Sequence, residues 1–216
     1  MFESVFNELR LTKVNQINES DFRSEKTQHI MKLPIVAYGD PVLKKIGTDI
    51  DKDYPELKQL ISDMFDTMYY ANGVGLAAPQ IGLPIRLFIV DTGEDEDGNP
   101  GYKKVFINAK IVEETGEPWF FNEGCLSIPD IRENISRKPN VKINYLDENF
   151  VEHTDDVDGM SARVIQHEYD HIEGKLFTDK VSVLRKTMLK SKLDAISKGN
   201  IKTDYKMKFP NKSKKR

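Results

Sequence analysis

The chain has 216 residues and a formal net charge of -3, with 31% charged and 38% hydrophobic residues. This length and balance predict one globular domain, with a tail at one or both ends, that is large enough for a real core. No apolar run approaches the ~20 residues of a transmembrane helix, so we expect no membrane span.

Neither the single cysteine nor the start of the chain points to export. Cys125 has no partner for an internal disulfide, which fits a reducing compartment. Residues 1–30 carry several acidic groups, without the apolar core of a signal peptide or the arginine-rich composition of a transit peptide. We therefore predict a cytoplasmic protein whose first thirty residues are a partly disordered extension, with a short helix over residues 3–11.

An amphipathic helix is predicted to begin near Tyr54-Pro55, with proline in its first turn, and to end at Asn72-Gly73. Residues 41–46, before it, are predicted to form a loop. The apolar positions of the helix recur every three or four residues: Leu57, Leu60, Ile61, Met64, Phe65 and Met68.

The run Gly73-Val-Gly-Leu-Ala-Ala-Pro-Gln-Ile-Gly82 follows this helix. Its first two glycines permit close approach of the backbone to a ligand. A dinucleotide-binding turn and a plain loop are the competing interpretations, and the first is weak because no third glycine follows and no strand precedes. Gln80 either satisfies local backbone groups or directs an amide N–H at a substrate oxygen.

Strands are predicted from apolar and alternating segments at residues 86–91, 104–113, 141–146 and 150–154. The last two form a hairpin across Asp147-Glu148-Asn149, and His153 is expected on a strand face or in solvent. The acidic residues 92–101 are predicted to form a solvated loop. Strands followed by a functional helix predict an α+β fold.

The functional helix is predicted over residues 161–173, which contain no proline or glycine. His167 and His171 lie one turn apart and would face one metal ion, with Glu168 placed to take a proton from water. The alternative is an ordinary helix that carries two histidines. Half of the four histidines of the chain fall in this turn, which favours a metal site.

A metal held by two histidines needs a third protein ligand. A lone cysteine is usually a small buried hydrophobic residue. Here the Cys125 sulfur would complete a set of two imidazoles and one thiolate, which leaves a fourth position open, as in catalytic sites. Such donors suit zinc, iron, nickel or cobalt.

The C-terminal part of the chain is strongly basic. Gly174 is expected to end the histidine helix, and a last helix is predicted from about Val181. From residue 181 onward the chain has twelve Lys and Arg residues against Asp194 and Asp204. A solubilising tail and a tail that touches RNA through its phosphates both fit this composition.

Three segments together resemble, in order, the signature motifs of peptide deformylase: Gly73-Val-Gly-Leu-Ala-Ala-Pro-Gln80, Glu123-Gly-Cys-Leu-Ser127 and Gln166-His-Glu-Tyr-Asp-His171. The resemblance extends from about Leu33 to Asp179. It implies an α+β fold in which antiparallel strands pack around the metal-binding helix. We therefore expect an extension over residues 1–30, a catalytic domain over residues 31–199 and a basic tail over residues 200–216.

The resemblance also implies the activity, which is removal of the formyl group from the initiator methionine of newly made polypeptides, with release of formate. Cys125, His167 and His171 would hold one divalent ion, ferrous iron in the cell, with zinc, nickel or cobalt possible in preparations. Glu168 would act as general base, while the Gln80 amide and the Leu126 N–H would stabilise the formyl oxygen. Substrate-binding roles would fall to Gly73, Val74, Gly75, Glu123, Gly124 and Arg132.

Further expectations concern ion pairing and partners. Glu123 is expected to pair with Arg137 as a structural clamp behind the cysteine, although a surface ion pair is the alternative. The expected substrate is a formyl-methionyl nascent peptide, and the ribosome is a candidate partner of the basic tail, with a solubilising role as the alternative. Neither a membrane nor specific DNA is expected as a partner.

Two other functions compete with deformylation. A zinc endopeptidase would use the same helix but would normally add a histidine or a carboxylate as third ligand. A non-catalytic relative that binds ribosomes or metal would be expected to lose Glu168 or Gln80, and both are present.

Overall fold

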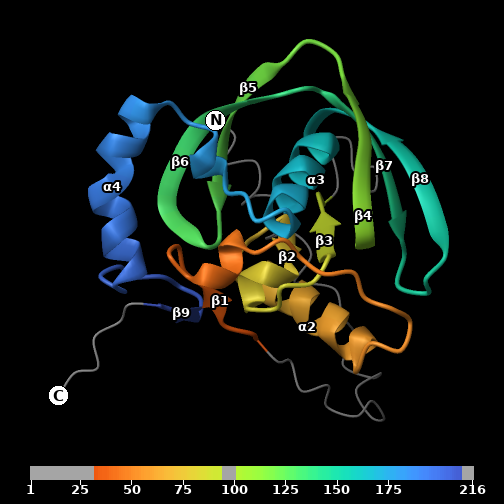
Figure 1. Cartoon of the computed structure of the whole chain (residues 1–216). Coiled ribbons are helices and arrows are strands. Elements are labelled where there is room, and N and C mark those ends of the chain that lie inside the picture. The colour runs from red at the N-terminus through yellow and green to blue at the C-terminus, as the bar shows by residue number, and fades with distance from the viewer. Residues whose placement is uncertain (1–31, 94–100, 211–216) are drawn as a thin grey trace, which may run out of the picture. The chain divides into compact units, whose positions relative to one another are not determined.

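The computed structural model describes residues 32–93 and 101–210. The predicted extension with its short helix, most of the predicted acidic loop and the last six residues lie outside the described residues. The main elements are β1 (Ile35–Val36), α2 (Leu57–Tyr70), β2 (Gly75–Ala77), β3 (Leu87–Asp91), β4 (Lys103–Thr115), β5 (Trp119–Cys125), β6 (Ile128–Arg137), β7 (Asn140–Leu146), β8 (Glu152–Val157), α3 (Gly159–Ile172), α4 (Val183–Ser197) and β9 (Met207–Lys208) (Figure 1).

Most of the strands belong to one antiparallel sheet with the order β2-β3-β4-β7-β8. Strands β5 and β6 form a separate antiparallel pair, and β1 pairs with β9 in parallel. The predicted α+β fold is therefore confirmed, as are the four predicted strands with small shifts at their ends.

Strands β5 and β6 were not predicted, because charged residues occupy inward positions. Along β6 the buried positions alternate regularly after Ile131, yet they include Glu133 and Arg137. Glu123 is likewise buried in β5. An alternation of apolar and polar residues cannot reveal a strand whose inner face holds ion pairs.

Strand β2 corrects the expected plain loop or dinucleotide turn after Gly73. Residues Gly75–Ala77 pair with β3, and β2 is the edge strand of the sheet. A short 3-10 helix, Ala78–Ile81, follows directly and carries Gln80. The edge position leaves one side of β2 available for another extended segment.

Helix α2 begins at Leu57, so Pro55 precedes it rather than lying in its first turn. Its predicted end is confirmed. Asn72 has a φ of 57°, and its N–H bonds to the Tyr69 carbonyl while the Gly73 N–H bonds to that of Met68, at 3.0 and 2.9 Å. These two bonds form a Schellman motif that satisfies the last carbonyls of the helix. The predicted loop before α2 contains a short 3-10 helix, Pro41–Lys44.

Helix α3 is the predicted histidine helix, and Gly174, with a φ of 67°, follows its end as expected. Its apolar face, which includes Ala162 and Ile165, is buried against the five-stranded sheet. Figure 1 shows α3 between this sheet and the β5–β6 pair. The helix therefore presents one face to the sheet and another to the strand that ends in Cys125.

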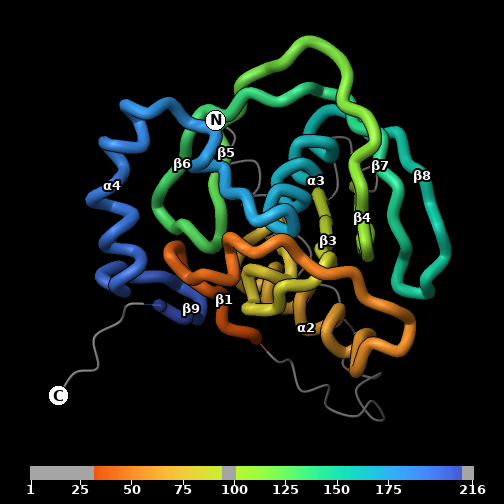
Figure 2. Tube along the Cα trace, in the orientation of Figure 1, coloured from red at the N-terminus to blue at the C-terminus, as the bar shows by residue number. Residues whose placement is uncertain are grey.

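The C-terminal residues return to the domain after α4. Helix α4 begins at Val183, with the Ser182 side chain as its cap, slightly later than predicted. Strand β9 then pairs with β1, as the trace in Figure 2 shows. The described part of the predicted basic tail, up to Pro210, is thus attached to the domain through a strand. None of the helices in the described residues is long and apolar enough to cross a membrane.

Candidate metal centre

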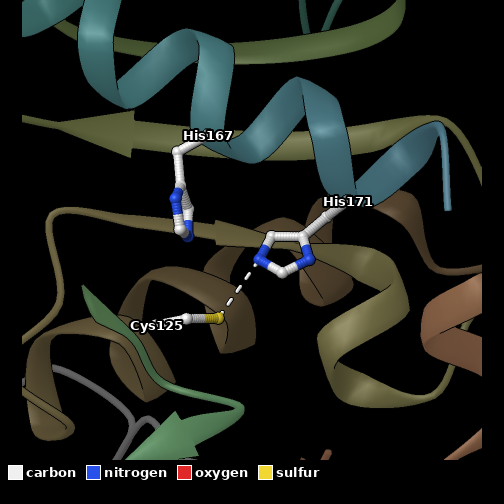
Figure 3. Close-up of side chains that lie close together, drawn as sticks. All are labelled: Cys125, His167 and His171. Carbon is white, nitrogen blue, oxygen red and sulfur yellow. Dashed lines mark hydrogen bonds between the residues drawn. The ribbon is translucent and has the colours of Figure 1, made fainter. Parts of the chain in front are cut away.

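Cys125, His167 and His171 lie together between β5 and α3 (Figure 3). One ligand atom from each of these residues lies within 4.8 Å of the others. The Cys125 Sγ is 3.3 Å from the His171 Nε2. Tetrahedral coordination with ordinary metal–sulfur and metal–nitrogen bonds places such a pair about 3.6 Å apart. The spacing and chemistry of the three donors therefore fit one divalent ion.

The two histidines face the same centre because they are one helical turn apart on α3. Burial lowers the pKa of His171 well below its ordinary value, which favours the neutral imidazole that binds metals. Burial also opposes protonation of His167, but hydrogen bonds with Cys125 and Glu123 outweigh it and raise the pKa of His167 to about 10. The charges around His167 therefore favour a positive charge, which a bound cation would supply in place of this proton.

Glu123 anchors His167 from behind. Its carboxylate accepts hydrogen bonds from Arg137 Nε at 2.7 Å and Nη2 at 2.9 Å, and from Arg163 Nη1 at 3.0 Å. The His167 Nδ1 lies 3.0 Å from the same carboxylate, which leaves Nε2 for the metal. Burial raises the pKa of Glu123, but hydrogen bonds from His167 and Arg137 outweigh it and hold that pKa well below its ordinary value.

The predicted clamp between Glu123 and Arg137 is present and buried, so the alternative of a surface ion pair is wrong. Arg137 also donates to Asp170 on α3, with a distance of 2.7 Å between Nη1 and Oδ2. The expected substrate-binding role of Glu123 does not fit its position, because its side chain is 4% exposed and both oxygens are engaged.

Arg163 and Asp170 also belong to this polar network, but the sequence analysis did not identify them as residues of the site. Charged residues inside a helix ordinarily suggest a solvated face. The spacing offered one signal for Arg163, which precedes His167 by four residues and so shares its side of the helix. Arg163 also bonds to the carbonyls of Ile135 and Trp119, at 3.0 and 2.8 Å, and so joins α3 to both strands of the β5–β6 pair.

Glu168 lies on the other side of the centre, against β2. Its carboxylate is buried, and the Oε2 atom has no hydrogen-bond partner among the described residues. Burial raises the pKa of Glu168 to about 7. A Cβ at Gly75 would lie 2.5 Å from the Glu168 Oε1, so a side chain at position 75 would displace this carboxylate. The site thus holds a carboxylate that can exchange a proton near neutral pH.

Gln80 combines the two roles considered for it. Its Oε1 accepts the Ala77 N–H at 2.8 Å, which satisfies a local backbone group. Its Nε2 faces the centre, 3.4 Å from the Cys125 Sγ and 3.5 Å from the Ser127 Oγ. The carbonyl end therefore fixes the side chain, and the amide end is presented beside the proposed ligands.

Leu126 follows Cys125 in the turn between β5 and β6. Its Cδ1 would lie 2.9 Å from a Cβ at Gly73, so the turn packs directly against the segment that leads into β2. The structure thus brings Leu126 together with Gly73. Val74, which follows Gly73 in the chain and precedes Gly75 of β2, is 38% exposed.

Gly124 and Arg132 are paired across β5 and β6. Arg132 is exposed and bonds to Asn122 of the same strand pair, with distances of 3.0 Å to Oδ1 and 2.8 Å to the carbonyl oxygen. His153 lies on β8, where its ring nitrogen is 2.9 Å from Asp147. It is not part of the cluster formed by Cys125 and the α3 histidines.

Residues 32–187 match the family model of polypeptide deformylase. The peptide deformylase of Christiangramia forsetii is 59% identical over 196 residues, which cover 86% of this chain and 100% of the relative. The peptide deformylase of Flavobacterium johnsoniae is 59% identical over 189 residues, which cover 83% of this chain and 96% of the relative.

Solved structures agree with these sequence matches. Peptide deformylase 1B of Arabidopsis thaliana, in complex with an inhibitor, has a TM-score of 0.69 and 36% identity over 78% of this chain and 92% of its own. The Legionella pneumophila enzyme has a TM-score of 0.68 and 38% identity, over 78% and 96%. A class I type b peptide deformylase of Acinetobacter baumannii, bound to Met-Ala-Ser, has a TM-score of 0.65 and 33% identity, over 70% and 99%.

Proposed function

Because the chain belongs to the polypeptide deformylase family, we propose that Cys125, His167 and His171 hold the metal ion on which its activity depends. The enzyme removes the N-formyl group from the initiator methionine of newly made polypeptides and releases formate. The observation that carries the assignment of the ligands is the convergence of their donor atoms within 4.8 Å, beside the buried carboxylate of Glu168.

Ferrous iron is the ion that we propose for the cell, and the preference for iron over zinc, nickel or cobalt rests on the family resemblance. All four ions accept imidazole and thiolate donors. When bound, such an ion lowers the pKa of a coordinated water and polarises a carbonyl oxygen.

Glu168 is the proposed general base and general acid. Its raised pKa, about 7, lets it accept the proton of the attacking water near neutral pH. Attack on the formyl carbon is followed by cleavage of the carbon–nitrogen bond, and Glu168 returns the proton to the leaving amine. The products are formate and a peptide with a free N-terminal methionine.

Gln80 and Leu126 are proposed to stabilise the negative charge that develops on the formyl oxygen. The amide nitrogen of Gln80 is held beside Cys125, and the Leu126 N–H follows the cysteine directly in the turn. One donor of this type is worth roughly 3 kcal/mol in acyl-transfer transition states.

The peptide substrate is proposed to lie along the free edge of β2, where Gly73 and Gly75 would offer backbone groups and Val74 a side chain. Gly124 and Arg132, on the β5–β6 pair, are proposed to contact the substrate from the opposite side.

We further propose that the basic residues 200–216 contact the ribosome and that the enzyme works in the cytoplasm, where its substrate is made. The division into an extension (1–30), a catalytic domain (31–199) and this tail is part of the same proposal.

The activity is tested by formate release from formyl-Met-Ala-Ser, whose deformylated product is the tripeptide bound to the Acinetobacter baumannii relative. The protein should be purified without oxygen and loaded with ferrous iron or nickel. We expect formate from the formyl peptide and no cleavage of internal bonds in an unblocked peptide. Cleavage of the unblocked peptide without formate release would identify an endopeptidase instead.

The ligand assignment is tested separately by Cys125→Ser. A serine hydroxyl binds these ions less well than a thiolate, so the variant should lose its metal on dialysis while the parent protein retains it. Metal content is measured by elemental analysis. Full occupancy of the dialysed variant would exclude Cys125 as a ligand.

A further inference from the structure

The segment that follows α4 returns to the candidate metal centre, although it lies beyond residue 187, where the family match ends. Strand β9 lies beside β1 (Figure 2). In the register of this pair, Met207 lies opposite Ile35. The Ile35 N–H donates to the Lys206 carbonyl at 2.9 Å. Because Ile35 is fully buried, this pairing attaches the backbone next to Tyr205 to the interior of the domain.

Tyr205 reaches the turn that contains the cysteine. Its hydroxyl donates a hydrogen bond to the Leu126 carbonyl, with a distance of 2.7 Å between the oxygens. A phenol has an ordinary pKa of about 10 and is therefore a donor at neutral pH. Tyr205 and Leu126 are both half-buried and pack against the same apolar cluster. The contact joins residues 79 positions apart in the sequence.

Two consecutive carbonyls of this turn are held from outside it. Tyr205 holds the carbonyl of Leu126, and the Tyr38 N–H donates to the carbonyl of Ser127 at 2.9 Å. On its other side, the Leu126 side chain packs close to Gly73. The turn is therefore held between Gly73, which leads into β2, and the β1–β9 pair.

We infer that Tyr205 is a positioning residue for deformylation: its hydrogen bond fixes the Leu126–Ser127 peptide plane at the Leu126 carbonyl. With this plane fixed, the adjoining Cys125–Leu126 plane has less freedom to rotate, and the Leu126 N–H that it carries stays in the orientation needed to stabilise the formyl oxygen. The inference rests on the proposed role of the Leu126 N–H. A donor of this kind is effective because it is oriented before the reaction, so looseness in the turn reduces transition-state stabilisation. Tyr205 acts only through its hydrogen bond to the turn and not through contact with the reacting atoms.

The substitution Tyr205→Phe removes the hydroxyl and keeps the ring. One hydrogen bond contributes little net free energy, so we expect kcat on formyl-Met-Ala-Ser to fall roughly 3- to 10-fold. KM should stay within about twofold, because the lost interaction acts in the transition state and the β2 edge is unchanged. Metal content should equal that of the parent protein, and hydrogen exchange in peptides that cover residues 125–128 should be faster.

Tyr102→Phe is the matched control. The hydroxyl of Tyr102, which directly precedes β4, bonds to Asp155 on β8 at 2.6 Å, so this variant also loses one phenol hydrogen bond. It should lower the melting temperature and leave kcat and hydrogen exchange at residues 125–128 unchanged.

A Tyr205→Phe enzyme with the kcat of the parent would overturn the inference, even if hydrogen exchange in the turn becomes faster. A loss of kcat that matches a loss of metal would also overturn it, because Tyr205 would then act through Cys125. In either case formate release by the parent would leave the deformylase activity itself intact.

Discussion

Both oxygens of Glu123, behind His167, have partners, whereas Glu168 has an oxygen without a partner among the described residues. The two carboxylates are both buried, and they belong to neighbouring parts of one site. Their pKa values move in opposite directions, because burial dominates at Glu168 and is outweighed by cationic partners at Glu123. Glu123 thus lies with the proposed metal ligands, whereas Glu168 lies beside β2, the proposed substrate edge.

The energetic consequence differs between the two regions. A buried charge with complete pairing is stable only while every partner is present, so removal of one partner is strongly destabilising. A buried carboxylate with an unpaired oxygen is already unfavourable, and its removal can stabilise the fold. Loss of stability and loss of activity should therefore fall on different residues.

The largest effect is expected for Glu168→Gln. The amide keeps the shape of the side chain but cannot accept the proton, so kcat should fall by about 10²- to 10⁴-fold. Metal content should be unchanged, and the melting temperature should be equal or higher. Formate release, elemental analysis and thermal unfolding check these three outcomes.

The matched control is Glu148→Gln, at an exposed position in the β7–β8 turn. It should leave all three quantities unchanged. A Glu168→Gln enzyme with substantial turnover would exclude Glu168 as general base. A clearly lower melting temperature would instead place Glu168 among the groups that hold the site together.

The next effect is expected for Arg137→Met, on the fully paired side. The substitution takes two hydrogen bonds from Glu123 and one from Asp170, and should lower the free energy of unfolding by about 3–5 kcal/mol. Metal affinity should fall by roughly 10- to 100-fold, because the orientation of His167 is no longer fixed. Denaturant unfolding and competition with a chelator measure the two effects.

Lys142→Met tests whether burial is the cause. Lys142 on β7 pairs with Asp156 on β8, and the two side chains are 40% and 76% exposed. Such a pair contributes about 0–1 kcal/mol, so this variant should be close to the parent in both measurements. Equal losses in Arg137→Met and Lys142→Met would contradict the distinction between the buried network and a surface ion pair.

The sequence predicts the parts of the site that depend on local spacing. His167 and His171 are one turn apart in a helix with a regular apolar face, and the end of α2 at Asn72-Gly73 follows from local turn chemistry. Features that depend on contacts between residues far apart in the sequence could not be predicted from local spacing. The inward charges of β5 and β6 hide these strands, and the positive charge of the C-terminal residues hides the pairing of β9 with β1.

The Gln80 side chain makes one contact that local sequence can predict and one that depends on the fold. Its sequence context suggested either a local backbone bond or a substrate contact, and the structure gives its two ends different neighbours. The bond to the Ala77 N–H is local and spans three residues, whereas the position of Nε2 beside Cys125 depends on the fold. Only the first of these could be worked out from the order of the residues.

A smaller effect is expected for Gln80→Leu, which removes a proposed donor on the substrate side. We expect kcat to fall by about 10²- to 10³-fold, less than the upper range for Glu168, while the metal is retained. The lost bond to Ala77 should lower the free energy of unfolding by about 1 kcal/mol. Steady-state kinetics and denaturant unfolding check both.

Gln59→Leu is the control, because this exposed glutamine on α2 also loses a side-chain hydrogen bond, to Asp63 at 2.8 Å. Its kcat should equal that of the parent. A Gln80→Leu enzyme that is unstable but fully active would show that Gln80 serves the backbone alone.

The smallest effect is the pH dependence of stability in the metal-free protein. The pKa of Glu168 rises from 4.5 to about 7 on folding, so between these values the folded state binds more protons and stability falls as the pH increases. Glu123 has the opposite sign, because its lowered pKa makes a contribution that is present above its unfolded pKa and is lost as the pH falls through the folded value.

Denaturant unfolding in the presence of a chelator, at several values from about pH 5 to 7, measures the slope directly. His167 and His171 also titrate differently in the two states, so the informative quantity is the difference between the parent and Glu168→Gln at each pH. The variant should gain stability relative to the parent as the pH rises, because only the parent must bury a carboxylate charge. If the difference in the free energy of unfolding between parent and variant stays constant across this range, the pKa of Glu168 is the same in the folded and unfolded states. Glu168 and Glu123 would then differ only in their hydrogen-bond partners.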